Sequence, residues 1–415
     1  MGLVLLVALS ACQDNPGPQP TLSSMLPTRA ASSTVSVATS LPSPTPTESA
    51  PSPTPTAADQ ILNPLTGLPV HQPETLGLAP LLISVTEFPP SARPQAGLSL
   101  ASQVWETSIG EGMSRFLAVY YGDYVDAFKK TFQAHPNQPG YAFAIGPIRS
   151  GRVGWETIKT FYPDGLLITR FASPEVAVQL TNLLTVYARD PKDVNSAGLT
   201  LSELEALAPP TIEPNSMMAL PFGSTVPSGG NSGLDLKLIY NLYDQILWRY
   251  DPKTGRYLRS QDPGDGSGDL VPLVDRLTGE TLGADNIVVL FANHTYENLA
   301  GTILKIRLLY LDRQPGLLLR DGRWYAIQWS TLKQNLMVQD QSGRPIALKP
   351  GQTYFEVVSR QSTWDPTDRV VRFHNPALPT LTPLPPITST PTATETTQPT
   401  QTLTPSPTPT ESPAP

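Results

Sequence analysis

The sequence has few of the features that mark common functional classes. It contains a single cysteine, Cys12, among 415 residues, so an intramolecular disulfide and a metal site built from several cysteines are both excluded. Only 15% of the residues are charged, and 28 basic residues stand against 35 acidic ones without a basic tract. We therefore expect no nucleic-acid partner, because such binding needs concentrated positive charge. No later apolar run approaches the roughly 20 residues that span a bilayer.

The motifs of familiar enzyme classes are also missing. None of the 4 histidines lies in an H-E-x-x-H pattern, and no G-x-S-x-G, P-loop or dinucleotide fingerprint occurs. Ser330 and Lys333 fit S-x-x-K, but the K-T-G that starts at Lys253 precedes them, which reverses the order found in penicillin-binding enzymes. We expect no cofactor and no metal, and the sequence favours a non-catalytic protein without deciding the question.

Proline is concentrated at the two ends of the chain. Twenty-two of the 47 prolines fall between residues 16 and 55 or between 376 and 415. These Pro/Ser/Thr-rich segments have no periodic apolar face, so burial cannot offset the entropy cost of ordering them. We predict a disordered linker over residues 13–58 and a disordered tail over residues 377–415. At about 3.1 Å per residue, an extended linker of about 45 residues would reach about 140 Å.

The N-terminus has the spacing of a lipobox. An apolar run, residues 3–9, leads into Ser10, Ala11 and Cys12, which resembles the bacterial pattern in which a signal peptidase cuts before a lipid-bearing cysteine. The alternative is a short core segment that ends in an inert cysteine. No basic residue precedes the apolar run, as one normally does in a signal peptide. Residues 1–12 therefore predict lipidation of Cys12 and attachment to the extracytoplasmic face of a bacterial cell membrane.

The first folded segment, residues 59–222, is predicted to mix strands and helices. Strand-length apolar runs are bounded by Gly, Pro and Asn, whereas Ser and Thr followed by helical spacing indicate helix starts. The expected strands are residues 80–87, 103–109, 115–121 and 166–171. The expected helices begin after Ser150, after Ser173 and after either Thr200 or Ser202, and the second of them runs to Tyr187.

The second folded segment, residues 233–376, is predicted to be mainly antiparallel β structure. A Gly/Ser-rich stretch at residues 220–233 separates it from the first segment and indicates a domain linker. Turn signals at residues 251–255 and 320–323 indicate hairpins. The strand-length runs are residues 234–240, 245–251, 286–293, 303–310, 316–322, 323–329 and 353–359. The complete chain is therefore assigned to the α+β class.

A set of arginines in the first segment is the strongest candidate site. If Ser150 caps a helix and Arg152 lies in its first turn, backbone N–H groups and guanidinium groups would point the same way and suit phosphate, sulfate or carboxylate. The equally weighted alternative is that nearby glutamates pair with these arginines and fix a structural corner. The candidate anion-binding residues are Arg93, Arg115, Arg149, Ser150 and Arg152. The candidate acid, base or ion-pair residues are Glu106, Glu111 and Glu156.

An ordered set of motifs is similar to those of the YerB-like lipoprotein family. The first segment contains NPLTGLPV, SARPQAGLSLASQVWE, SRFLAVY and GPIRSGR, and the second contains a Trp-x-Tyr-Asp stretch from Trp248 and an L-x-P-G-Q-T motif from Leu348. The resemblance covers about residues 61–360. It implies an N-terminal domain of unknown function, over residues 59–222, followed by a family-specific C-terminal domain, over residues 233–376. It supplies no established reaction.

Two main functional hypotheses follow from the sequence, and a third possibility is that the first segment only presents the β segment to a partner. The leading one is a lipid-tethered, non-catalytic binding or scaffold protein of the cell envelope, whose partner is an anionic envelope polymer or an envelope protein. The competing one is an enzyme that processes envelope glycans or phosphodiesters, in which arginines stabilise negative charge and Glu106 or Glu111 acts as acid or base. No sequence feature indicates an oligomeric state.

Overall fold

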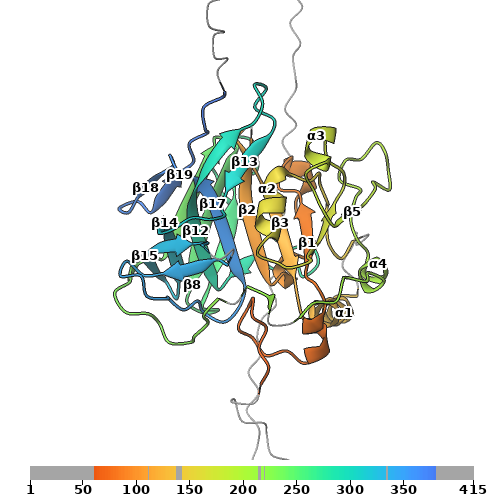
Figure 1. The fold of residues 1–415 in the computed structure, drawn as a ribbon, viewed down its shortest axis with the longest axis horizontal. Coiled ribbons are helices and arrows are strands. Elements are labelled where there is room, and N and C mark those ends of the chain that lie inside the picture. The colour runs from red at the N-terminus through yellow and green to blue at the C-terminus, as the bar shows by residue number, and fades with distance from the viewer. Residues whose placement is uncertain are drawn as a thin grey trace, which may run out of the picture. The chain divides into compact units, whose positions relative to one another are not determined.

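The computed structural model describes residues 60–379, except residues 111, 137–142, 214–215, 219 and 333–334. Cys12, the linker over residues 13–58 and nearly all of the C-terminal tail lie outside this range. Within it, two β-sheets are accompanied by four short α-helices (Figure 1). The helices are α1 (Tyr124–Ala134), α2 (Val153–Lys159), α3 (Pro174–Ala177) and α4 (Leu201–Glu205). None of these helices has the length and apolar character needed to cross a membrane.

The larger sheet has 12 strands and combines both folded segments. Its main order is β16-β15-β14-β12-β17-β2-β3-β1-β4-β5, with β13 beside β12 and β6 beside β15. Its strands are β1 (Leu81–Val85), β2 (Gln103–Gly110), β3 (Met113–Tyr120), β4 (Leu166–Thr169), β5 (Leu183–Thr185), β6 (Asn231–Ser232), β12 (Asn286–Tyr296), β13 (Leu304–Arg307), β14 (Gln314–Arg320), β15 (Arg323–Ser330), β16 (Met337–Gln339) and β17 (Thr353–Ser359).

The smaller sheet has 7 strands, all from the second segment. Its main order is β10-β9-β8-β7-β19-β18, with β11 beside β9. Its strands are β7 (Asp235–Asn241), β8 (Asp244–Asp251), β9 (Arg256–Gln261), β10 (Val271–Pro272), β11 (Gly283–Ala284), β18 (Thr363–Asp365) and β19 (Val370–Arg372). The hairpin turn before β9 is present as predicted, as is the one between β14 and β15.

The pairing of β2 with β17 joins the two segments into one sheet. The two strands are parallel, with Gln103 opposite Thr353 and Glu106 opposite Glu356, and they lie side by side in Figure 1. Both strands are buried along their entire length, as strands in the middle of a doubly covered sheet must be. The division into domains at residues 223–232 stays a prediction from the sequence, whereas the sheet is continuous across it.

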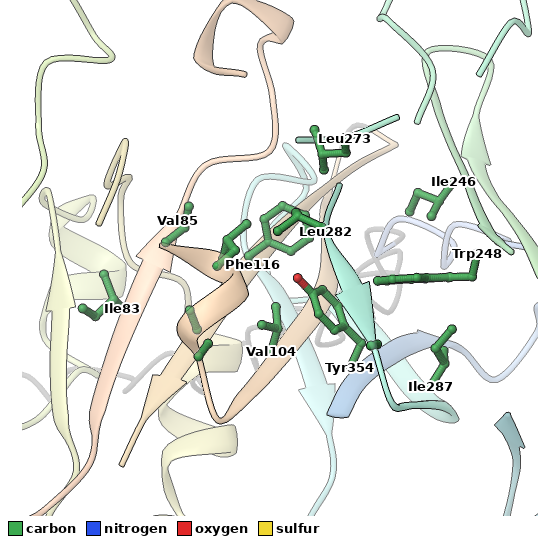
Figure 2. Packing of buried hydrophobic residues seen from close by; sticks show 14 of the residues in the cluster. Ile83, Val85, Val104, Phe116, Ile246, Trp248, Leu273, Leu282, Ile287 and Tyr354 are labelled. Atoms are coloured by element: carbon green, nitrogen blue, oxygen red, sulfur yellow. The ribbon is translucent and has the colours of Figure 1, made fainter. Parts of the chain in front are cut away.

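Side chains on the two faces of the larger sheet form two apolar clusters. On one face, residues of β1, β2, β3 and β17 pack against the smaller sheet. Figure 2 shows this packing, in which Trp248 from β8 lies beside Tyr354 from β17, with ring centroids 4.7 Å apart. On the other face, Trp105 and Leu117 pack with Trp155 and Ile158 of α2. Alternate residues of β2 and β3 therefore belong to different cores.

One of the three predicted helix starts and the extent of another helix differ from the structure. The second predicted helix begins after Ser173 as expected but ends at Ala177 instead of Tyr187, because Leu183–Thr185 forms β5 and pairs with β4. Tertiary pairing here overrides a local pattern that suits a helix. Ser150 does not cap α2: the cap position belongs to Arg152, and no side chain bonds the first turn. The third predicted helix is confirmed, and of its two candidate caps the structure has Thr200, which forms a capping box with Glu203 at the start of α4.

Candidate functional site

The loop of residues 146–152 brings three arginines together beside β3. Arg115 of β3 donates from Nη1 to the backbone oxygen of Ser150 at 3.0 Å and lies 3.4 Å from the Ser150 hydroxyl. Arg152 donates from Nη1 to the same hydroxyl at 3.1 Å. Arg149 reaches outward and donates to Asn195 Oδ1 at 3.0 Å. Ser150 therefore serves as a shared acceptor between two guanidinium groups.

The positive charges of this cluster repel one another. Burial lowers the pKa of the Arg115 guanidinium well below its usual value, and the charges of Arg152 and Arg149 lower it further. The pKa of Arg149 is also lowered, by burial first and then by the charge of Arg170. Among the described residues, no carboxylate lies within ion-pair distance of Arg115 or Arg149, and the Nε atom of each is buried without an acceptor. A negative group placed here would relieve the repulsion and supply an acceptor.

A hollow of about 540 Å³ opens next to this cluster. Its lining includes Ser150 and Arg152 from the arginine loop and Phe171 from the segment after β4. The remaining polar lining comes from Ser173, Glu175, Asn298 and Thr302. Ser150 and Arg152 thus belong both to the cluster and to the wall of an accessible cavity.

Arg93, the fourth predicted arginine, lies elsewhere. Its guanidinium forms an ion pair with Glu87 and also donates to the backbone oxygens of Glu87 and Asp262. Its side chain is only 10% exposed. The contacts of Arg93 are therefore structural and link the end of β1 to the segment after β9.

The structure separates two of the predicted glutamates from the arginines. Glu106 is fully buried and accepts from Arg259 at 2.7 and 3.1 Å and from the Ser114 hydroxyl at 2.6 Å. Glu156 pairs with Lys159 at 3.0 Å and accepts from the backbone and the hydroxyl of Thr181. Glu111 lies outside the described residues. Neither Glu106 nor Glu156 pairs with the arginine cluster as the sequence alternative proposed.

Strand periodicity explains why Glu106 and Arg115 do not meet. In the β2–β3 register Glu106 is opposite Phe116, whereas Arg115 is opposite Thr107. Residues directly opposite one another share a face, and neighbours along a strand point to opposite faces. Glu106 therefore faces the smaller sheet, and Arg115 faces the side of the sheet that α2 covers.

A buried carboxylate cluster between the two sheets was missed by the sequence analysis. Glu106 of β2, Glu356 of β17 and Asp244 of β8 are all 0% exposed and surround Arg259 of β9. Burial raises the pKa of Glu356 well above its usual value, and the charge of Glu106 adds to this. Burial and Glu106 also raise the pKa of Asp244, to about 6. The available signal was a glutamate between the apolar residues Phe355 and Val357 in the predicted strand TYFEVVS.

The quoted motifs mostly build structure. Asn63 of NPLTG accepts from Leu65 N and donates to the backbone oxygen of Tyr121, both at 2.9 Å. Gly351 of the P-G-Q-T motif donates from its N–H to the backbone oxygen of Thr66 at 2.8 Å, so the two motifs hold the ends of the folded region together. A Cβ on Gly351 would lie 2.1 Å from Asp285 Oδ2, which explains why this position of the motif holds a glycine. In the described part of the chain, no group of three or more His, Cys, Asp or Glu residues could hold a metal ion.

Comparison with known proteins assigns the chain to a two-part family. Residues 65–196 match the family described as "Protein of unknown function (DUF3048) N-terminal domain". Residues 236–355 match the "Protein of unknown function (DUF3048) C-terminal domain". The chain therefore belongs to this YerB-like family, and its own fold is of the predicted α+β class.

Two comparisons identify a particular relative. The chain is 26% identical over 324 residues to "Putative lipoprotein YerB" of Bacillus subtilis (strain 168), covering 72% of this chain and 87% of the relative. It is also similar to the crystal structure of YerB protein from Bacillus subtilis, with a TM-score of 0.55 and 22% identity, covering 72% of this chain and 97% of that chain. The second likeness concerns the fold alone.

Proposed function

We propose that this protein is a non-catalytic lipoprotein of the bacterial cell envelope that binds an anionic polymer through Arg115, Arg149 and Arg152. The observation that carries the proposal is the convergence of Arg115 and Arg152 on Ser150, to which both guanidinium groups donate. A guanidinium that is 7% exposed sits among like charges with no carboxylate pair in the described part of the chain. Such an arrangement is costly unless a negative group occupies it part of the time. Phosphate and carboxylate groups both fit the planar guanidinium forks.

Attachment to the membrane is the second part of the proposal. The lipobox at residues 1–12 supports it, as does the name of the Bacillus relative. A long Pro/Ser/Thr linker would then let the folded region reach polymers well away from the bilayer. In a native bacterial host, Cys12→Ser is expected to move the protein out of the membrane fraction. An unmodified, uncleaved N-terminus in the membrane fraction by mass spectrometry would contradict the anchor.

The contacts of Glu106 favour binding over catalysis. An acid or base must reach the reacting atoms, but Glu106 is enclosed between the sheets and bound to Arg259. Glu156 already accepts three hydrogen bonds or ion-pair contacts from Lys159 and Thr181. The enzyme alternative therefore lacks support from either described glutamate.

The anion site is tested with the double variant Arg149→Gln/Arg152→Gln. Both residues are partly exposed, so the fold should survive, whereas Arg115 is too buried for a clean test. Each charge-assisted hydrogen bond contributes about 1.5–3 kcal/mol, so binding to purified anionic wall polymer should weaken at least about 10-fold. The charge-matched control is Arg344→Gln/Arg372→Gln, at exposed positions outside the cluster, and its binding should be nearly unchanged. A folded Arg149/Arg152 variant that binds as well as wild type would refute the proposal.

A further inference from the structure

Phe171 is an exposed aromatic residue fixed beside the arginine loop. Its ring is 52% exposed and lines the hollow that Ser150 and Arg152 also line. Its backbone oxygen accepts from Gly151 N at 2.7 Å, and Arg170 N donates to the Arg149 oxygen at 3.0 Å. Two backbone hydrogen bonds thus hold the segment of Phe171 against the arginine loop, so the ring has a defined place next to the positive charge.

The guanidinium of Arg170 lies over the Phe171 ring at 5.5 Å from its centroid. This contact restrains the aromatic side chain, although most large apolar side chains avoid such exposure. A rigid, exposed ring that costs little further entropy to order is well suited to pack against the apolar face of a ligand. A sugar ring packed on Phe171 in this way would keep its hydroxyl groups available for polar side chains.

Polar groups around the hollow suit a neutral, hydroxyl-bearing ligand. The Ser173 hydroxyl makes no capping bond to α3. Thr302 Oγ1 accepts from Asn298 Nδ2 at 2.7 Å, which leaves its hydroxyl proton available to donate. The exposed carboxylate of Glu175 can accept from a sugar hydroxyl but would repel a second negative charge. The lining therefore offers a guanidinium at Arg152 and groups suited to uncharged hydroxyls elsewhere.

The dimensions agree with a ligand larger than a bare anion. The hollow of about 540 Å³ lies within the range of about 300–1,000 Å³ typical of small-molecule sites. A single phosphate group would occupy only the part beside Ser150 and Arg152. The remaining space, between Phe171, Ser173 and Thr302, is the part that an attached group would fill.

We infer that the hollow binds a sugar phosphate, with the phosphate at the arginine cluster and the sugar ring packed on Phe171. This inference rests on the proposed function and names the chemical class of its ligand. A polymer of phosphate-linked sugars would present the same unit repeatedly. The specificity for such a polymer would then come from Phe171 and its polar neighbours, while the arginines supply the attraction for charge.

The test compares inorganic phosphate, glucose 1-phosphate and glucose as probes of the full-length protein by isothermal titration calorimetry. Glucose 1-phosphate should bind wild type at least about 10-fold more tightly than inorganic phosphate, because the sugar ring removes apolar surface of Phe171 from water. Phe171→Ala should abolish this gain and leave phosphate binding unchanged, whereas Phe171→Tyr should retain it. Tyr187→Ala, at a residue 79% exposed outside this hollow, is the control and should retain it as well.

Separate outcomes identify which inference fails. Equal affinity for phosphate and glucose 1-phosphate, unaffected by Phe171→Ala, would overturn the sugar phosphate inference and leave the anion site standing. Loss of phosphate binding in Phe171→Ala would also overturn it, because the ring would then only support the arginine loop. If neither phosphate probe binds wild type, or if Arg149→Gln/Arg152→Gln binds both as wild type does, the proposed anion site fails as well.

Discussion

Replacing Arg259 with methionine should strongly destabilise the fold. The change removes the one guanidinium among the described residues that contacts Glu106 and Glu356, at 2.7 and 3.6 Å, and leaves both carboxylates between the sheets. It also removes the contacts of the guanidinium with the rings of Phe116 and Trp248. Breaking a buried ion pair by removing one partner costs about 3–5 kcal/mol. For about 300 folded residues the unfolding entropy is roughly 0.6 kcal/mol per kelvin, so Tm should fall by roughly 5–8 °C.

Calorimetric unfolding at several pH values checks the cause of this loss. The charge of Arg259 lowers the pKa of Glu356 in the folded protein, so its removal raises that pKa further. A carboxyl group whose pKa is higher in the folded than in the unfolded protein stabilises the fold at low pH. This contribution to stability is lost as the pH rises through the pKa of the folded protein. The deficit of Arg259→Met relative to wild type should therefore be largest near pH 8 and shrink toward pH 5.

Two further variants sharpen the measurement. Glu106→Gln/Arg259→Met removes a negative charge together with the positive one, so it should recover part of the lost stability. Arg372→Met, at an exposed position on β19, should leave Tm nearly unchanged. A loss below about 1 kcal/mol in Arg259→Met, or a loss independent of pH, would refute the account of a charge network that the guanidinium holds together.

Other predictions concern positions away from this network. Gly351→Ala should lower the free energy of unfolding by about 1–3 kcal/mol, because the φ of 136° and the Asp285 carboxylate both exclude a Cβ at this position. Gly77→Ala is the control, since the space around Gly77 is open. Equal denaturant midpoints for the two variants would disprove the steric explanation. Burial lowers the pKa of His294 to about 4, so wild type should lose up to about 3 kcal/mol between pH 6.5 and 4 as the unfolded histidine takes up protons. His294→Gln should flatten this part of the pH profile, and an unchanged slope would show that His294 is not responsible.

Local sequence signals predicted much of the strand content correctly. The runs at residues 80–87, 103–109 and 353–359 form β1, β2 and β17, because β-branched and aromatic residues suit a buried sheet. The start of α4 was also predicted, with Thr200 as one of its two candidate caps. Each of these features depends on residues within one short segment, which a single sequence records directly.

Features that depend on distant residues could not be predicted in this way. The parallel pairing of β2 with β17 connects strands about 250 residues apart, and no short turn specifies it. The same holds for the arginine site: the spacing of GPIRSGR indicated Arg149 and Arg152, but the strand register decided that Arg115 joins them while Glu106 faces away. Arg93 looked equivalent in sequence, yet Glu87 holds it elsewhere.

The shared sheet has a consequence for how this protein can be divided. Cutting the chain at residues 223–232 would expose the unpaired edges of β2 and β17 and separate Glu106 from Arg259. Long apolar strand edges promote aggregation, and a lone buried charge is costly. The two family segments, although recognised separately, should therefore be expressed, inherited and exchanged between proteins as one piece.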